Sequence, residues 1–155
     1  MRYEIVNAKL RHLEQLLQIE SRCFSVPFTR EQLLSQMPDS MHVFLAAEAE
    51  NGDVLGYVGM MYVLDEGYIS NVAVSPDYRR TGIADALIKR LLQIANELEL
   101  SFVTLEVRES NAPAISLYEK NGFSPVGKRK NYYTLPAEDA ILMTSYLNTR
   151  NEDNI

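Results

Sequence analysis

Tryptophan is absent from this chain of 155 residues, and cysteine and histidine are scarce. The single cysteine, Cys23, cannot form an internal disulfide, which agrees with a reducing compartment. We expect its side chain to be a small buried hydrophobe. The two histidines, His12 and His42, match no zinc-ligand spacing with it, so we expect both on the surface and predict no metal site.

Long apolar runs are also missing. No stretch approaches the length that crosses a membrane, and Met1 leads directly into a strand-like alternation rather than a signal peptide. Hydrophobic residues make up 46% of the chain and charged residues 23%, as in globular proteins. We therefore expect one domain at residues 1–147, a polar, frayed tail at residues 148–155, and a cytoplasmic protein without a membrane partner.

Positive charge is in deficit. Lysine and arginine number 15 against 21 aspartates and glutamates, which gives a net charge of −6. Such a chain repels the phosphates of nucleic acids, so we expect no nucleic-acid partner, and we favour a monomer. A basic peptide would suit this charge, although mild acidity also serves solubility alone.

The spacing of hydrophobic residues predicts an α/β fold with a mixed sheet flanked by helices. Helices are expected at about 10–23, from a capping box at Thr29–Gln32 to Pro38, at 83–98, and from a cap at Ser110 or Asn111 to Gly122. Strands are expected at 3–7, 42–48, 54–63, 68–74, 102–107, 127–134 and 140–147.

Turn residues and helix stripes indicate how these elements connect. Asn51-Gly52 tolerates the positive φ angles of a tight hairpin turn, and residues 65–67 turn the chain again, which gives a three-stranded antiparallel meander. The strand–helix–strand order implies a parallel crossover between 68–74 and 102–107. The helix between them presents one apolar stripe to the sheet, made of Ala84, Leu87, Leu91, Ala95 and Leu98.

The segment from Tyr78 to Ala84, YRRTGIA, has the composition of a phosphate cradle. Gly82 allows a ligand to approach the backbone, the following helix offers its positive N-terminal end, and Arg79 and Arg80 supply countercharge. The segment is neither a P-loop nor a Rossmann fingerprint. An ordinary surface turn with two solvated arginines is the alternative.

Glu106 is unusual because a strand reached by a parallel crossover is usually apolar on both faces. A carboxylate near the C-terminal end of such a strand lies where open α/β sheets bind ligands. The alternative is an ordinary ion pair with Arg108. Tyr118 can reach the same cleft or serve as a core aromatic. The loop Phe24–Phe28 can be one wall of a substrate groove or pack on the core.

Several segments together resemble the GNAT superfamily of acetyl-CoA-dependent N-acetyltransferases and, more narrowly, the bacterial ribosomal-protein-alanine N-acetyltransferases. The resemblance runs from about Ile5 to Leu147, and its combined spacing is more specific than any one motif. The matching segments are Arg79–Ala84, Leu105–Arg108, Ser110-Asn111, Ala114–Glu119, Asn121–Phe123, Asn131–Tyr133 and Glu138–Ile141.

This resemblance implies a mostly antiparallel sheet splayed open between two parallel strands, with acetyl-CoA as the acetyl donor in the split. It implies that Glu106 is the general base and that Tyr118 protonates the departing thiolate. The acceptor would be a protein N-terminus, possibly of a ribosomal protein, bound beside Phe28, Tyr132 and Tyr133. The donor-binding residues would be Val72, Ala73, Val74, Arg79, Arg80, Thr81, Gly82, Ile83, Ala84, Asp85 and Asn111.

Ordinary pKa values bear on these roles. A free phenol near ~10 donates a proton to a thiolate of pKa ~8.5 at little cost, whereas proton abstraction by a free carboxylate from an α-ammonium is uphill by about 5 kcal/mol. An amine that arrives neutral avoids this cost. Near pH 7.4 roughly a quarter of an N-terminal amine is neutral but only about a thousandth of a lysine amine, so an α-amine is the easier nucleophile.

Two segments depart from the family pattern, and both would wall the acceptor groove. Family members often carry Pro-Trp where this chain has Pro27-Phe28, and the connection from Arg129 to Glu138 is short and ends in Leu135-Pro136. A small-molecule amine or lysine acetyltransferase is therefore an alternative. A CoA-binding module without catalysis is another, although the presence of both Glu106 and Tyr118 argues against it.

Overall fold

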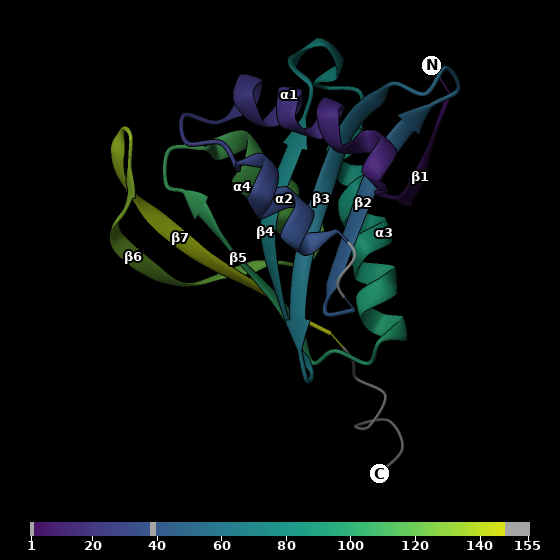
Figure 1. Cartoon of the computed structure of the whole chain (residues 1–155). Helices are drawn as coiled ribbons and strands as arrows, with labels where there is room; N and C mark the ends of the chain where they lie inside the picture. The colour runs from purple at the N-terminus through teal and green to yellow at the C-terminus, as the bar shows by residue number, and fades with distance from the viewer. Residues whose placement is uncertain (1, 38–39, 148–155) are drawn as a thin grey trace. The chain divides into compact units, whose positions relative to one another are not determined.

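A seven-stranded mixed sheet with four α-helices forms the described part of the chain, which is residues 2–37 and 40–147 of the computed structural model (Figure 1). The strand order in the sheet is β1-β2-β3-β4-β5-β7-β6. The strands are β1 (Tyr3–Asn7), β2 (His42–Ala49), β3 (Val54–Val63), β4 (Glu66–Val74), β5 (Phe102–Arg108), β6 (Ser124–Thr134) and β7 (Ala137–Tyr146). The helices are α1 (Leu13–Cys23), α2 (Arg30–Gln36), α3 (Ile83–Glu97) and α4 (Ala112–Lys120), with short 3-10 turns at Leu10–His12 and Pro76–Tyr78.

The chain divides into two compact units, which we describe separately. The first comprises residues 1–61 and 69–91, and the second comprises residues 62–68 and 92–155. No helix within the described residues is long and apolar enough to cross a membrane.

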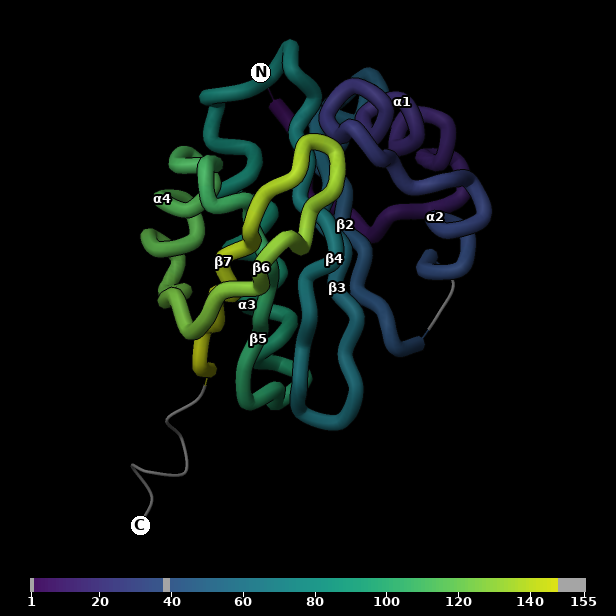
Figure 2. The backbone as a smooth tube through the Cα atoms, turned by 90° about the vertical axis from the view of Figure 1, so that its left-hand side faces the viewer, coloured from purple at the N-terminus to yellow at the C-terminus, as the bar shows by residue number. Residues whose placement is uncertain are grey.

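In the first unit, β2 pairs antiparallel with both β1 and β3. Helices α1 and α2 lie on one face of these strands and the first turns of α3 on the other, as Figures 1 and 2 both show. The capping box predicted at Thr29 is present, since its side chain accepts the N–H of Gln32 and the Gln32 side chain accepts the N–H of Thr29. Pro38, predicted to end this helix, lies outside the described residues.

In the second unit, β7 pairs antiparallel with β5 on one side and with β6 on the other. The start of β4 pairs parallel with β5 over three residue pairs, from Glu66–Phe102 to Tyr68–Thr104, which confirms the predicted crossover. Asn111 caps α4 by accepting the N–H of Ala114, and Gly122 follows the helix at φ +90°, as the sequence predicts.

Several boundaries differ from the prediction. The strand β4 begins at Glu66, because the turn is made by Leu64, at φ +55°, and Asp65. In the turn of residues 50–53, only Gly52 has a positive φ. Helix α3 ends at Glu97, so Leu98 does not belong to its apolar stripe and is 39% exposed. Ile88, which the predicted stripe omitted, is fully buried instead.

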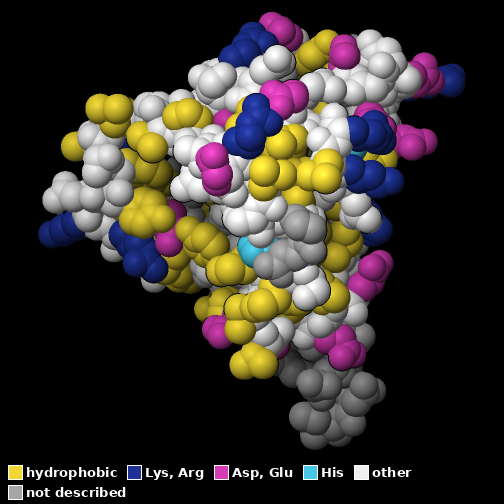
Figure 3. Space-filling view, viewed as in Figure 1, with side chains coloured by type: hydrophobic (Ala, Val, Ile, Leu, Met, Phe, Trp, Pro, Cys, Tyr) yellow, Lys and Arg dark blue, Asp and Glu magenta, His cyan; other side chains and the backbone are white. Residues whose placement is uncertain are grey.

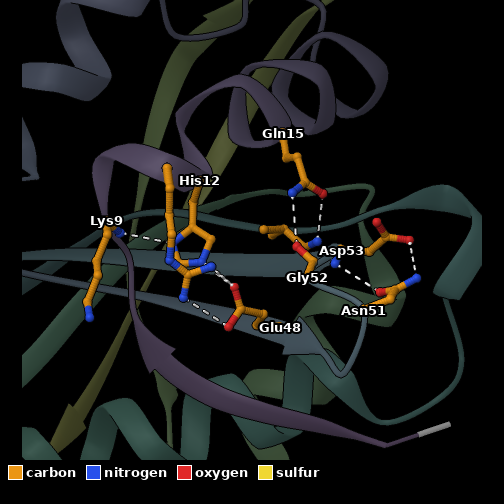
Figure 4. A network of polar contacts seen from close by, with 9 residues as sticks. Lys9, His12, Gln15, Glu48, Asn51, Gly52 and Asp53 are labelled. Carbon is orange, nitrogen blue, oxygen red and sulfur yellow. Dashed lines mark hydrogen bonds and ion pairs between the residues drawn. The ribbon is translucent and has the colours of Figure 1, made fainter.

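His12 is buried, contrary to the expectation of a surface residue. Figure 4 shows why: its Nδ1 accepts the backbone N–H of Lys9 at 2.9 Å, and its Nε2 lies 2.7 Å from the carboxylate of Glu48. Because Nδ1 is an acceptor, the proton of the neutral ring is on Nε2 and is donated to Glu48. Arg11 also donates to Glu48, and these donors lower the pKa of that carboxyl to about 2. The network ties the start of α1 to β2.

Candidate active site

Glu106 is held by two donors in the second unit. Along β5 the side chains alternate between a buried face and a partly open face, and Glu106 lies on the open face with its side chain only 6% exposed. The Tyr68 hydroxyl donates to one carboxylate oxygen at 2.5 Å, and Arg129 Nε lies 3.0 Å from the other. The strand is therefore not apolar on both faces, and Glu106 does not interrupt a doubly buried pattern.

The ion pair between Glu106 and Arg108, which the sequence offered as the alternative role of Glu106, does not form. Arg108 instead reaches the tip of the β6–β7 hairpin, where it donates to Glu138 at 3.2 Å and to the carbonyls of Pro136 and Leu135 at 2.9 and 3.2 Å. Its guanidinium also stacks over the Tyr133 ring at 4.2 Å. Glu106 and Arg108 are two residues apart on the same strand, yet Glu106 lies in the pocket and Arg108 binds the hairpin.

A pocket of about 300 Å³ opens in front of Glu106. This size is at the lower end of the range for small-molecule sites. Its wall combines aromatic rings, two threonine hydroxyls and the Glu106–Arg129 ion pair. The lining residues are Tyr68, Phe102, Thr104, Glu106, Arg129, Leu142, Thr144 and Tyr146, all from the second unit.

Tyr132 and Tyr133, predicted to contact the acceptor, lie where the β6–β7 ladder is irregular. The register shifts between Arg129 and Tyr133, and Asn131 has φ +54° while its N–H donates to Asp139 at 2.8 Å. Such a bulge redirects side chains. The two tyrosine rings pack edge to face at 5.0 Å, and Tyr132 is 44% exposed. Its hydroxyl also forms a hydrogen bond with Tyr68.

The phenols of Tyr68 and Tyr133 remain protonated at neutral pH. Burial, reinforced by the hydrogen bond to Glu106, raises the pKa of Tyr68. Burial likewise raises the pKa of Tyr133 to about 12. A phenol in this state donates hydrogen bonds and does not compete with Glu106 for negative charge.

Tyr118 is a core aromatic in geometry. The side chain is 8% exposed and packs edge to face on Phe123 at 5.7 Å. Burial first, and then the nearby Tyr133, raise its pKa above the ordinary value. Proton donation from Tyr118 to a thiolate is therefore more uphill than the ordinary phenol value implies. The same shift keeps the proton on the residue until a strong base forms beside it.

The predicted phosphate cradle adopts a conformation that suits an anion. Arg80 and Gly82 both have positive φ, +63° and +82°, and the Thr81 hydroxyl donates to the Tyr78 carbonyl at 2.5 Å. A Cβ on Gly82 would meet nothing within 4 Å, so the space beside this backbone is open. Helix α3 begins at Ile83, and the first N–H groups of a helix have no intrahelical acceptor. These features fit a diphosphate.

Other predicted donor-binding residues have partners of their own. The carbonyl of Val74 accepts the thiol of Cys23 at 3.4 Å, and Arg79 also points to that sulfur at 3.4 Å. Cys23 is thus half-buried and hydrogen-bonded rather than a plain core hydrophobe. The carbonyl oxygen of the Asn111 side chain caps α4, which leaves its NH₂ group to donate to a ligand.

The sequence matches the model of the acetyltransferase (GNAT) family over residues 13–123, well over half of the chain. The chain therefore belongs to this family and is an acetyl-CoA-dependent N-acetyltransferase by class. Among the described residues no group of three or more His, Cys, Asp or Glu could hold a metal ion.

The names of similar proteins are more specific than the family. The ribosomal protein bS18-alanine N-acetyltransferase of Escherichia coli K12 is 37% identical over 127 residues, which is 81% of this chain and 84% of the relative. An N-alpha-acetyltransferase of Sulfurisphaera tokodaii is 31% identical over 158 residues, covering 94% and 93%. The crystal structure of the E. coli ribosomal-protein-S18-alanine N-acetyltransferase aligns with a TM-score of 0.86 at 32% identity, covering 96% of this chain and 98% of that one.

Sequence reasoning did not find Tyr68 and Arg129. Both contact Glu106, yet Tyr68 stands at a predicted strand start and Arg129 in a run of basic residues that is typical of a solvated hairpin. The pairing of β4 with β5 brings Tyr68 to Glu106, and the pairing of β5 and β6 on either side of β7 brings Arg129 to it.

Proposed function

We propose that this acetyltransferase moves the acetyl group of acetyl-CoA to the N-terminal α-amine of a protein, most directly a ribosomal protein that begins with alanine or serine. The observation that carries the proposal is Glu106, a carboxylate placed in a pocket by Tyr68 and Arg129 beside the tyrosine-bearing hairpin. Two relatives, named a ribosomal protein bS18-alanine N-acetyltransferase and an N-alpha-acetyltransferase, support the same acceptor.

The acetyl donor is held by main-chain groups and two arginines. The N–H groups of Thr81 to Asp85 and the guanidinium groups of Arg79 and Arg80 bind its diphosphate, because a helix N-terminus and a turn with positive φ present several donors to one anion. The backbone of Val72, Ala73 and Val74 pairs with the pantetheine arm, and the Asn111 amide donates to it.

The reaction forms a C–N bond and breaks a C–S bond. The acceptor nitrogen attacks the thioester carbonyl, and Glu106 takes the proton that this nitrogen loses, either directly or through a water molecule. Tyr118 gives its proton to the thiolate of CoA as the C–S bond breaks. The products are a neutral amide and a neutral thiol, with one proton gained by Glu106 and one lost by Tyr118. Proton exchange with solvent then returns both side chains to their starting states.

The hairpin and the loop before α2 receive the acceptor chain. The phenol of Tyr133 keeps its proton, so it can donate to a peptide carbonyl, while the rings of Tyr132 and Tyr133 cover the incoming residue. We assign Phe28 to acceptor binding as well. An α-amine suits the site because a larger fraction of it is neutral at physiological pH than of a lysine amine.

A panel of acceptors tests this function. Each acceptor is supplied with acetyl-CoA, and free thiol is measured. The acceptors are peptides with a free N-terminal alanine or serine, the same peptides with a blocked N-terminus and an internal lysine, a polyamine, and an amino sugar. We expect turnover with the free N-termini. With the other acceptors we expect a rate of thiol release no more than about tenfold above background. Turnover that needs the lysine, polyamine or amino sugar would contradict the proposal and favour a lysine or small-molecule acetyltransferase.

A second measurement identifies the natural acceptor. Mass spectrometry compares the N-termini of cellular proteins in strains with and without this protein. The expected difference is the loss of N-terminal acetylation on one or a few ribosomal proteins.

Calorimetry with acetyl-CoA separates a catalyst from an interaction domain, since the latter would have no affinity for the donor.

A further inference from the structure

Glu20 is a carboxylate inside the apolar core of the first unit. It lies near the C-terminal end of α1, and the residue is 1% exposed. The surrounding core cluster includes Leu16 and Ile19 of α1, Leu33 of α2 and Phe44 of β2. Carboxylates are rarely buried to this extent unless something specific requires them.

Three hydrogen-bond donors from three different segments converge on Glu20. They are the backbone N–H of Phe28 at 2.7 Å, the hydroxyl of Tyr57 on β3, and the side-chain amide of Asn71 on β4. Tyr57 and Asn71 are also bonded to each other at 2.8 Å. All described polar partners of the carboxylate are neutral donors, so its charge is solvated by dipoles and not by a cation.

Burying this carboxylate lowers the stability of the folded protein. Burial raises the pKa of Glu20 to about 7, although the hydrogen bonds from Phe28 and Asn71 oppose the shift. Well-packed apolar residues commonly replace buried charges without loss of stability. A leucine among these core side chains would avoid the desolvation penalty, so the benefit of the carboxylate lies in what it holds.

The carboxylate holds the Phe28 end of the loop Phe24–Phe28, and the last backbone hydrogen bond of α1 holds the Phe24 end. The backbone carbonyl of Glu20 accepts the N–H of Phe24 at 3.0 Å, while its side chain accepts the N–H of Phe28. Phe24 and Phe28 pack partly buried on the core, whereas Val26 between them is 69% exposed. In Figure 3 hydrophobic side chains come to the surface over α2, which this loop precedes.

We propose that Glu20 is a positioning residue that fixes the loop Phe24–Phe28 in the shape that receives the acceptor chain. Its bonds to Tyr57 and Asn71 anchor the loop to β3 and β4. The inference rests on the proposed function, because it assigns to this loop the wall of the acceptor groove. It predicts that loss of the anchor weakens binding of the acceptor and leaves binding of acetyl-CoA unchanged.

Glu20→Leu, Glu20→Gln and a control, Leu16→Ala, test the inference. Leu16→Ala removes packing from the same helix and the same core cluster but keeps the anchor. Glu20→Leu removes the acceptor of the Phe28 N–H, and Glu20→Gln retains one side-chain oxygen for it. Glu20→Ala takes the place of Glu20→Leu should the latter not be recovered as folded protein.

Two readouts are needed. With an N-terminal peptide as acceptor, we expect Glu20→Leu to raise the KM for the peptide about tenfold or more and to change the KM for acetyl-CoA and kcat by less than about threefold. Glu20→Gln should restore the peptide KM to within about threefold of the parent, and Leu16→Ala should leave it there. Independently of turnover, amide hydrogen exchange should show lost protection at Phe28 in Glu20→Leu but not in Leu16→Ala.

The outcomes separate the inference from the proposed function. A parent protein that acetylates no peptide contradicts the proposed function, and the exchange of the Phe28 amide then still decides whether Glu20 anchors the loop. A parent that acetylates peptides, with an unchanged peptide KM in Glu20→Leu, overturns the inference alone. Equal losses in Glu20→Leu and Leu16→Ala would also overturn it, because they would reflect general destabilisation.

Discussion

Tyr68 and Arg129 each occupy a different oxygen of the Glu106 carboxylate, Tyr68 at 2.5 Å and Arg129 at 3.0 Å. Each oxygen of Glu106 therefore already has one donor, and since a carboxylate accepts about four hydrogen bonds, sites remain for an incoming amine or water. Arg129, with its side chain 56% exposed, is the partner more easily displaced, since exposed ion pairs are worth little.

Glu106→Gln should lower kcat by about 10²–10⁴, because the amide cannot accept the proton that the acceptor nitrogen loses. The fold should persist, since the amide keeps one oxygen to accept a hydrogen bond. Steady-state kinetics with a peptide acceptor measure the effect. Glu109→Gln is the control, as this exposed carboxylate only pairs with Lys128. A loss below about threefold in Glu106→Gln would remove Glu106 from the mechanism.

Tyr68→Phe should lower kcat by about tenfold, the scale of one hydrogen bond to a charged group. The ring stays, while the donor that orients the carboxylate is lost. The KM for acetyl-CoA is expected to stay unchanged. Tyr3→Phe, on strand β1 of the first unit, serves as the matched loss of a phenolic hydroxyl and should have no effect on kcat. Equal rates for the parent and Tyr68→Phe would show that Arg129 and packing suffice to orient Glu106.

Tyr118→Phe should lower kcat by about 10²–10⁴ while thermal stability changes little. The phenylalanine keeps the edge-to-face contact with Phe123, so the packing survives and only the proton is lost. Because burial raises the pKa of Tyr118, no alkaline loss of activity from this group is expected near neutral pH. A variant as active as the parent would leave Tyr118 with a packing role only.

Gly82→Ala should raise the KM for acetyl-CoA, because alanine disfavours the φ of +82° on which the cradle depends. Gly52→Ala is a closely matched control: its φ is +92°, and a Cβ at either glycine meets nothing within 4 Å. Both variants should lose about 1–2 kcal/mol of stability. Only Gly82→Ala should weaken binding of acetyl-CoA, with a rise of about tenfold in its KM. Equal effects on KM would indicate general destabilisation.

The pH dependence of stability should carry the signature of Glu20. Its pKa is about 7 in the folded protein against an ordinary value of 4.5, so the folded state binds this proton more tightly than the unfolded chain does. The free energy of unfolding should therefore fall by roughly 3 kcal/mol between about pH 4.5 and pH 7 and then level off. Urea denaturation across this range measures it, and Glu20→Gln should abolish the decline.

Glu48 does not obscure this test. Its pKa of about 2 is lowered, chiefly by the hydrogen bond from Arg11, so its contribution is present above about pH 4.5 and is lost only as the pH falls towards 2. The two carboxyl groups thus act in separate pH windows and with opposite sign. A decline between pH 4.5 and 7 that persists in Glu20→Gln would have to come from another group.

Local sequence signals predicted the elements well where one residue type decides the backbone. The capping box at Thr29, the Asn111 cap and the positive φ of Gly122 all stand as expected. Strand ends were less accurate, and β6 and β7 each begin three residues before the predicted start. Pairing between the two strands supplies the extra residues, with Ser124 opposite Thr144 at the start of β6 and Ala137 opposite Thr134 at the start of β7, and that pairing is a tertiary property.

The site was predicted as a set of residues and not as a set of contacts. Glu106 and the hairpin tyrosines follow from motif and position, whereas the partner of Glu106 does not. Arg108 stood two residues away and Arg129 on another strand, and the choice between them depends on how β7 aligns β5 and β6. The burial of His12 was missed for the same reason, because Glu48 reaches it from a distant strand.

Arg108 has a consequence for how specificity can change. Its guanidinium donates hydrogen bonds to the Glu138 carboxylate and to two carbonyls of the hairpin tip, and it lies over the face of the Tyr133 ring. A single replacement at this position would loosen the tip and let the tyrosine pair shift without altering either tyrosine. The range of accepted N-termini could therefore change through Arg108, with both tyrosines kept.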